Sequence, residues 1–303
     1  MNDSMAIVAQ ALTKSYGSVA ALRGVNLEVR RGEIFGFLGP NGAGKTTAIR
    51  CLLDLIRPQG GALRVLGIDP QADPVAVRSR VGYLPGELRI DDNLTVEAAL
   101  HFFNALRGGK ADWDYTRQVA DRLDLDLKPQ FKNLSRGNKQ KVGLVQAMMH
   151  RPELLMLDEP TTGLDPLVQH EVLHLVAEAK AAGATVFFSS HILSEVQEIA
   201  ERVGIIRHGV VVEVAETESL IHRAMRRVSI RFEQAIDGEA LARIPGVKIF
   251  RRDSETSVLL QVEGKMDSLI KALAAYPVAD FETERPSLDE IFLAYYESGH
   301  EVK

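Results

Sequence analysis

The 303-residue sequence has one cysteine, few aromatic residues and no excess of basic charge. The single cysteine, Cys51, excludes an intrachain disulfide framework and any metal site built from several cysteines, and it fits a reducing compartment. The 36 Lys and Arg against 41 Asp and Glu give a formal charge of −5. That balance argues against wholesale binding to nucleic acid, although it leaves a local basic patch open.

Long apolar runs are also missing. The longest, such as Leu154–Leu157 and Gly209–Ala215, fall far short of the roughly 20 residues that span a bilayer. The segment Met1–Gln10 carries Asp3 and no continuous apolar stretch, so we expect no secretory signal. At roughly 100–200 residues per domain, the length favours two domains.

The first two thirds of the chain, assigned here to a domain of residues 1–215, alternate apolar runs with helical patterns. This order predicts an α/β fold with a mainly parallel sheet and crossover helices. The expected strands are Ile34–Leu38, Leu154–Leu157, Thr185–Ser189 and Val203–Ile206, and the expected helices are Lys45–Ile56, Leu167–Ala182 and Ile192–Arg202. Helical spacing from Leu94 to Lys128 predicts an inserted helical subdomain, placed at about residues 88–150.

After a link over residues 216–227 the pattern changes. Residues 228–303 predict the β-α-β-β-α-β order of a ferredoxin-like α+β domain. The expected elements are strand Val228–Phe232, helix Gly238–Arg243, strands Val247–Arg251 and Ser257–Val262, helix Met266–Tyr276 and strand Val278–Glu282. A last helix is expected after Ser287, with an apolar stripe that packs within its own chain or against a second copy. The stripe consists of Leu288, Ile291, Phe292 and Tyr295.

A glycine-rich segment follows the apolar strand Ile34–Leu38. Residues 39–47 read GPNGAGKTT and match G-x-x-x-x-G-K-[ST]; the alternative is a turn that matches by chance. Backbone N–H groups in such a loop curl around phosphate oxygens, and the following helix directs its positive end to the same anion. Lys45 would reach the β- and γ-phosphates, and the Thr46 hydroxyl would bind Mg²⁺. The predicted phosphate-binding residues are Gly39, Asn41, Gly42, Gly44, Lys45, Thr46 and Thr47.

Two carboxylates follow the apolar strand Leu154–Leu157. Asp158, at the end of a strand that neighbours the phosphate loop, is placed to hold Mg²⁺ through water. Glu159 points elsewhere and can accept a proton from an attacking water. An Asp-Glu pair after a strand is ordinarily a solvated loop start, but the phosphate loop upstream favours the catalytic interpretation.

Together these segments resemble the nucleotide-binding subunit of an ATP-binding cassette (ABC) transporter, with a P-loop NTPase core. Residues 134–140 read LSRGNKQ and are similar to the family's signature LSGGQ, in which Ser135 and Gly137 would close on ATP held by a second subunit. From the residues alone, Ser135 and the N–H groups of Gly137 and Asn138 open a helix Lys139–His150 and form an anion site.

Further family motifs follow. TGLDP at residues 162–166 resembles the D-loop, and the Ser189-Ser190-His191 segment puts the family's switch histidine at a strand end, where ligands bind in open α/β sheets. The resemblance implies that Lys45, Glu159 and this histidine are catalytic. It also makes Tyr16 the aromatic that stacks on adenine, although an isolated aromatic more often serves packing.

The sequence departs from the family at one loop. Where the family has Gln after a Tyr-x-Pro stretch, residues 81–87 read VGYLPGE, so that Gly86 takes the position of the glutamine. Either Glu87 supplies the missing oxygen beside Mg²⁺ and the attacking water, or water alone fills the position.

The end of the chain, RPSLDEIFL at residues 285–293, resembles the tail of the multidrug, antibiotic and lipid exporter (ABC-2) group, whose permease is a separate chain. The resemblance implies an ATPase that binds ATP and Mg²⁺ between two copies of itself. It would drive transmembrane permease subunits from the cytoplasmic face of the membrane. The helical subdomain and the loop Gly86–Leu94 would hold the permease's coupling helix, unless the subdomain is a self-contained cap.

Two other functions compete with this one. A soluble ABC ATPase acting on ribosomes or DNA usually carries two cassettes or long coiled-coil insertions, which this sequence lacks, and the acidic balance also argues against it. A regulatory sensor that binds ATP without turnover would not need Glu159 and His191.

Overall fold

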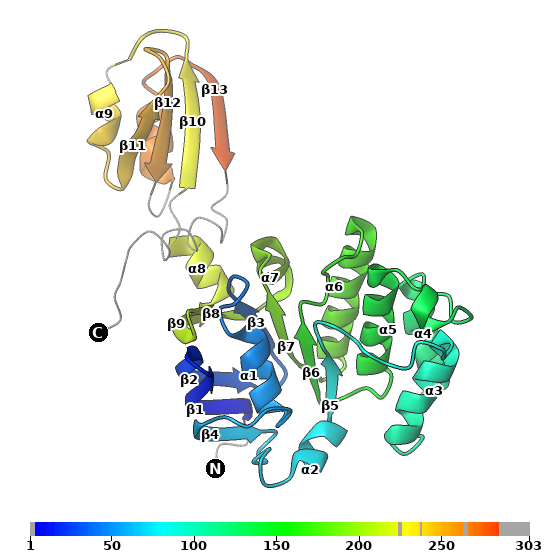
Figure 1. Ribbon diagram of the computed structural model, residues 1–303. Helices are drawn as coiled ribbons and strands as arrows, with labels where there is room; N and C mark the ends of the chain where they lie inside the picture. The colour runs from blue at the N-terminus through cyan, green and yellow to red at the C-terminus, as the bar shows by residue number, and fades with distance from the viewer. Residues whose placement is uncertain (1–3, 224–225, 237, 263–265, 285–303) are drawn as a thin grey trace. The chain divides into compact units, whose positions relative to one another are not determined.

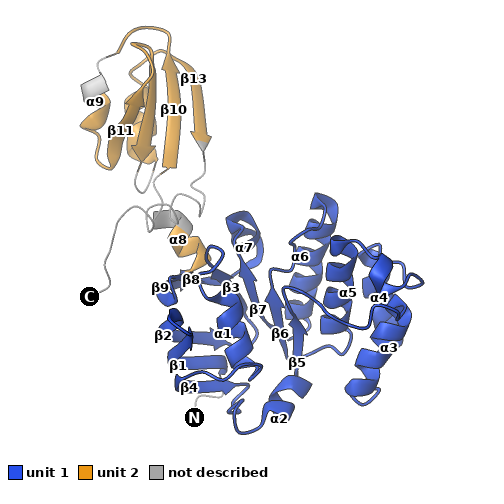
Figure 2. Ribbon diagram, in the orientation of Figure 1, with its two compact units in different colours: residues 1–215 blue, residues 216–303 orange. Residues whose placement is uncertain are grey.

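The computed structural model describes residues 4–284 except 224–225, 237 and 263–265. The chain divides into two compact units, residues 1–215 and 216–303 (Figure 2). Each unit has a hydrophobic core of its own.

Unit 1 is built on a six-stranded sheet in the order β5-β6-β7-β3-β8-β9. The neighbours from β5 to β8 run parallel. The strands are β5 (Val81–Leu84), β6 (Leu154–Asp158), β7 (Thr185–Ser190), β3 (Ile34–Leu38), β8 (Arg202–Arg207) and β9 (Val210–Glu216). Strands β3, β6 and β7 are buried throughout, as expected for apolar runs in a sheet covered on both faces. The four predicted strands are therefore confirmed.

Three helices connect these strands as predicted: α1 (Lys45–Leu52), α6 (Pro166–Ala181) and α7 (Leu193–Ile199). The predicted ends of α1 and α7 were wrong. Helix α1 stops before Ile56 because Asp54 takes a positive φ of 49°. Helix α7 stops short because β8 already begins at Arg202.

A second sheet of unit 1 was not predicted. It is antiparallel, in the order β2 (Val19–Arg30), β1 (Met5–Tyr16) and β4 (Gly60–Val65). Irregular register along β1 and a positive φ of 49° at Ala11 interrupt the alternation of apolar and polar residues. A strand is predicted from the sequence by that alternation, so β1 was not predicted.

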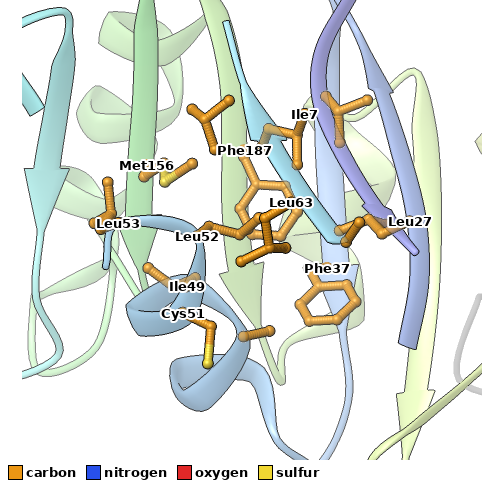
Figure 3. Packing of buried hydrophobic residues seen from close by; sticks show 14 of the residues in the cluster. Ile7, Leu27, Phe37, Ile49, Cys51, Leu52, Leu53, Leu63, Met156 and Phe187 are labelled. Atoms are coloured by element: carbon orange, nitrogen blue, oxygen red, sulfur yellow. The ribbon is translucent and has the colours of Figure 1, made fainter. Parts of the chain in front are cut away.

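The main core of unit 1 lies where α1 meets both sheets (Figure 3). Residues from α1, the parallel sheet and the antiparallel sheet meet there, and the side chains labelled in Figure 3 are at most 4% exposed. The labelled residues are Ile49, Cys51 and Leu52 of α1, Leu53 directly after it, Phe37, Met156 and Phe187 of the parallel sheet, and Ile7, Leu27 and Leu63 of the antiparallel sheet. This packing fixes the start of α1 against the ends of the parallel strands.

The predicted helical subdomain contains α3 (Val96–Leu106), α4 (Trp113–Arg122) and α5 (Arg136–Met148), which lie together at one side of unit 1 (Figure 1). Their N-terminal caps are Thr95, Asp112 and Ser135, whose side chains each accept a backbone N–H. The start predicted for α5, Lys139, was wrong because the Ser135 cap begins the helix at Arg136. Two short helices, α2 (Pro74–Ser79) and η1 (Phe131–Asn133), complete the unit.

Unit 2 has a four-stranded antiparallel sheet in the order β11-β12-β10-β13. After α8 (Thr217–Arg223), its elements are β10 (Arg226–Phe232), α9 (Gly238–Ala242), β11 (Val247–Arg252), β12 (Ser257–Val262), α10 (Asp267–Leu273) and β13 (Val278–Glu284). The predicted β-α-β-β-α-β order is confirmed. The predicted last helix with its apolar stripe lies outside the described residues.

In the described part of the chain, no helix combines the length and the apolar character needed to cross a bilayer.

The separate cores predict separate unfolding. Leu260 is fully buried in the core of unit 2, so Leu260→Ala should destabilise that unit by about 2–5 kcal/mol. Differential scanning calorimetry of the full chain should then show one transition at a lower temperature and a second one unmoved. The reciprocal variant in unit 1, Leu155→Ala, should move the other transition. If both variants shift all heat absorption together, the two units unfold as one.

Candidate functional site

The glycine-rich loop between β3 and α1 curls because of its backbone angles. Gly44 has a φ of 113°, and a Cβ at this position would lie 2.7 Å from the Ala21 carbonyl oxygen, which leaves no room for another residue. A cavity of about 160 Å³ opens at the loop. Its lining consists of Ala21, Pro40, Asn41, Gly42, Gly44, Lys45, Thr46, Thr47 and Glu159. Six of the seven predicted phosphate-binding residues thus border one cavity, and the seventh, Gly39, directly precedes Pro40 of the same lining.

Lys45 is held inside the loop. The side chain is 5% exposed, and Nζ lies 3.4 Å from Oε1 of Glu159. The ammonium also donates to the carbonyl oxygens of Gly39 and Pro40. Burial lowers the pKa of Lys45, and the nearby Glu159 charge opposes that shift. The Lys45 ammonium is thus held at the cavity, where it can bind an anion.

Asp158 ends β6 with its two carboxylate oxygens in different situations. Oδ1 accepts a hydrogen bond of 2.7 Å from the Ser189 hydroxyl of β7. Oδ2 is buried and has no hydrogen-bond partner among the described residues. A buried carboxylate oxygen requires compensation, and a hydrated Mg²⁺ beside the Thr46 hydroxyl would supply it. The residues present therefore fit the metal expected from the sequence.

Glu159 is the point at which three segments meet. Its Oε1 faces Lys45, while its Oε2 lies 3.4 Å from Nδ1 of His191 and accepts a 3.2 Å hydrogen bond from Thr162. Glu159 has a positive φ of 53°, and this turn of the backbone directs its side chain away from that of Asp158. The structure thus brings Lys45, Glu159 and His191 together, with Glu159 part-buried and His191 39% exposed.

Ser135 and Gly137 lie at the start of α5 and do not line the cavity of the phosphate loop. The Asn138 N–H donates to the Ser135 hydroxyl, so that Ser135 caps α5 within this chain. Gly137 packs on the D-loop-like segment, because a Cβ there would lie 2.8 Å from the Gly163 carbonyl oxygen.

Two predicted residues stand apart. Tyr16 ends β1 with 48% of its surface exposed, and the Lys14 ammonium lies 5.6 Å from its ring centre. Glu87 forms a 2.8 Å ion pair with Arg89, which lowers the pKa of Glu87. Its neighbour Gly86 is the residue that faces Asp158, with a Cβ position 3.5 Å from Oδ2.

The contacts of two polar residues that support the site were not predicted from the sequence. These residues form hydrogen bonds with the segments that carry Glu159 and His191. Gln140 of α5 donates to the Glu159 carbonyl oxygen at 2.9 Å. Glu195 of α7 accepts from the hydroxyls of Thr161 and Ser190. Gln140 ends the signature-like segment LSRGNKQ, but its contact with Glu159 could not be read from that motif, and Glu195 belongs to no motif, because a polar residue in a helix ordinarily faces solvent. Only the fold turns them inward.

Comparison with known proteins identifies the family. A model described as ABC transporter matches residues 22–162, and a model of the C-terminal domain of DrrA1-3-like ATP-binding proteins matches residues 193–296. The daunorubicin resistance ATP-binding protein DrrA3 of Streptomyces coeruleorubidus is 34% identical over 98% of each chain. The chain belongs to the ABC transporter family. A bacitracin transport ATP-binding protein, BcrA of Enterococcus faecalis, is 36% identical, covering 78% of this chain and 77% of that protein.

Solved structures agree on the fold. The ATP-binding subunit of an ABC transporter superposes with a TM-score of 0.64 and 30% identity, covering 71% of this chain and 91% of that one. The dimeric structure of a bacterial ABC transporter cassette gives a TM-score of 0.62 at 20% identity, over 70% of this chain and 98% of that one. The predicted P-loop NTPase core of the ABC ATPase type is confirmed.

The function predicted from the sequence is confirmed as well. The chain is an ATP-binding subunit of an ABC transporter of the exporter group, and it hydrolyses ATP to drive transport. The relatives do not support the alternative of a soluble ATPase that acts on ribosomes or DNA.

The loop geometry predicts a graded effect of two glycine substitutions. Gly42 has a φ of 81° with open space around it, whereas Gly44 combines a positive φ with the close Ala21 carbonyl. Gly42→Ala should cost about 1–2 kcal/mol of stability from its backbone alone. Gly44→Ala should cost more and should weaken ATP binding more strongly. Urea unfolding and calorimetric titration test this order, and equal effects of the two variants would contradict it.

Proposed function

We propose that the cavity at the phosphate loop binds the triphosphate of ATP. The loop residues from Gly39 to Thr47 would surround the phosphates, with the Lys45 ammonium on the β- and γ-phosphates and Tyr16 against the adenine. Support comes from the buried ammonium, which already sits within the loop, and from the exposed ring of Tyr16.

We propose that Asp158 and Thr46 hold Mg²⁺. The support is the buried, unpartnered Oδ2 of Asp158 and the position of Thr46 in the lining of the cavity. When bound, the ion would neutralise phosphate charge and fix the phosphate oxygens. Ser189 donates a hydrogen bond to Oδ1 and leaves Oδ2 without a partner among the described residues, so that Oδ2 would be the oxygen available to the ion.

Glu159 is the proposed general base. The observation that carries this proposal is the single carboxylate bordered by the Lys45 ammonium and the His191 ring. Glu159 would take a proton from the attacking water, while His191 would contact the γ-phosphate from the adjacent strand end.

We propose that two copies of the chain enclose ATP. Ser135 and Gly137 of one copy would complete the site of the other, since neither residue lines the phosphate-loop cavity of its own chain. A similar cassette has been solved as a dimer, which supports this arrangement.

The permease is the proposed membrane partner, bound from the cytoplasmic side. A groove of about 550 Å³ between the phosphate-loop core and the helical subdomain would receive its coupling helix. The groove has exposed apolar residues at its rim, including Val75 and Leu106, which are 70% and 69% exposed. The named relatives serve antibiotic resistance or transport, so we propose an antibiotic-like compound as the exported substrate.

We assign the ATP chemistry to residues 1–215 and an accessory role to residues 228–303. Each of the two regions belongs to a unit with its own core. The accessory region lacks a phosphate-loop motif, and we propose that it serves assembly or regulation.

Replacing the proposed base tests the function directly. Glu159→Gln should lower kcat by about 10²–10⁴-fold, because an amide cannot accept the proton of water, while ATP binding persists. Lys45→Ala should instead lose tight ATP binding. ATPase assays and calorimetric titration separate the two effects. Glu201→Gln is the matched control, because this glutamate pairs with Lys180 on the surface and should leave kcat unchanged. If Glu159→Gln turns over at the parent rate, another group activates the water.

The metal role of Glu87 stays a prediction, and its ion pair allows a clean test. Glu87→Ala and Arg89→Ala both break the 2.8 Å pair, but only the first removes the carboxylate. If Glu87 binds the water shell of the metal, Glu87→Ala should raise the Mg²⁺ concentration needed for half-maximal ATPase activity by about 10-fold. Arg89→Ala should leave that concentration unchanged. Equal Mg²⁺ titration curves for the two variants would contradict the metal role of Glu87. Water alone would then take the place of the missing glutamine oxygen.

A further inference from the structure

Glu195 is a buried carboxylate to which the proposed chemistry gives no part. It lies in the first turn of α7 and is 6% exposed. The Thr161 hydroxyl donates to Oε1, and the Ser190 hydroxyl donates to Oε2 at 2.8 Å. Burying a carboxylate is costly unless hydrogen bonds compensate it, so these two bonds define where the residue can sit.

The two hydroxyls belong to the two segments that carry the proposed catalytic pair. Thr161 follows Glu159 by two residues in the loop after β6, and Ser190 directly precedes His191 at the end of β7. Glu195 therefore joins both loops from the side of α7. The two segments also meet at Glu159 itself: its backbone N–H donates to the Ser189 carbonyl oxygen at 3.1 Å and to the Ser189 hydroxyl at 3.2 Å, and its Oε2 lies 3.4 Å from Nδ1 of His191.

Both residues have further hydrogen bonds that hold them in place. The Ser190 hydroxyl accepts from the Ile192 N–H at 2.9 Å, and its proton has two acceptors in reach, Oε2 of Glu195 at 2.8 Å and the Ile192 carbonyl oxygen at 3.3 Å, of which the carboxylate is the nearer. The Thr161 carbonyl oxygen accepts from Gln169 of α6 at 3.4 Å, which holds the backbone while the side chain reaches Glu195. The loops are thus held at defined atoms rather than by general packing.

We propose that Glu195 is a positioning residue that sets the relative placement of Glu159 and His191. The inference rests on the proposed roles of that pair in ATP hydrolysis. A small misplacement of reacting groups can lower a rate by about 10²-fold. Loss of the Glu195 bonds should accordingly act on kcat and leave the phosphate loop, and with it ATP affinity, in place.

A double-mutant cycle on the full chain tests this. Thr161→Val keeps the shape and removes one hydroxyl, and Glu195→Ala removes its acceptor. Each should lower kcat by about 10-fold or more while the KM for ATP stays within about 2-fold. If both act through the same bond, the double variant should be no slower than the slower single variant. Glu195→Gln keeps one acceptor oxygen and should recover part of the rate.

Thr116→Val is the matched control. Thr116 is fully buried and donates to the Asp112 carbonyl oxygen in α4, so the same chemical change there should leave kcat unchanged. The proposal is overturned if Thr161→Val retains the parent kcat, if the control lowers kcat equally, or if the two losses multiply in the double variant. These outcomes differ from failure of the proposed base, which would appear as full activity of Glu159→Gln.

Discussion

The site depends on three parallel strands that end side by side. β6, β7 and β3 are neighbours in the sheet, so Asp158, Ser189 and the phosphate loop emerge at one edge. The strands hold this position because they are paired in register and because Phe35 and Phe37 of β3 pack against Phe187 of β7, with ring centres 5.9 and 5.3 Å apart. A shift of β6 against β3 would separate Asp158, the proposed metal ligand, from the loop proposed to bind phosphate.

The residues proposed to recognise phosphate could be predicted because their chemistry leaves a local pattern. The positive φ of Gly44 beside the Ala21 carbonyl favours glycine, and a lysine and a threonine follow it directly, so the segment GPNGAGKTT is recognisable from the sequence. Apolar strands such as β6 were equally visible, since a buried parallel strand is a continuous apolar run. Asp158 and Glu159 could then be placed by their position at a strand end.

What could not be predicted depends on contacts between distant segments. Glu195 and Gln140 face inward because α7 and α5 pack next to the loop after β6. Gln140 lies in the signature-like segment, yet neither that motif nor any pattern around Glu195 indicates which distant residue each side chain contacts. The sequence also left open whether Glu87 or water replaces the oxygen of the missing glutamine. Arg89, two residues along the chain, captures the Glu87 carboxylate, while Gly86 leaves space beside Asp158.

The loop after β6 is also the element through which the helical subdomain contacts the proposed catalytic group Glu159. Gln140 of α5 binds the Glu159 carbonyl oxygen, and Gly137 lies against the Gly163 backbone. Farther along, Arg122 of α4 forms ion pairs with Glu171 and Glu178 of α6, the helix that begins directly after this loop. These contacts tie both ends of the loop to the subdomain, whereas Glu195 ties its middle to the segment of His191. A displacement of the subdomain must therefore either carry the loop along or break bonds at Glu159, which makes the geometry of the proposed base sensitive to whatever binds the subdomain.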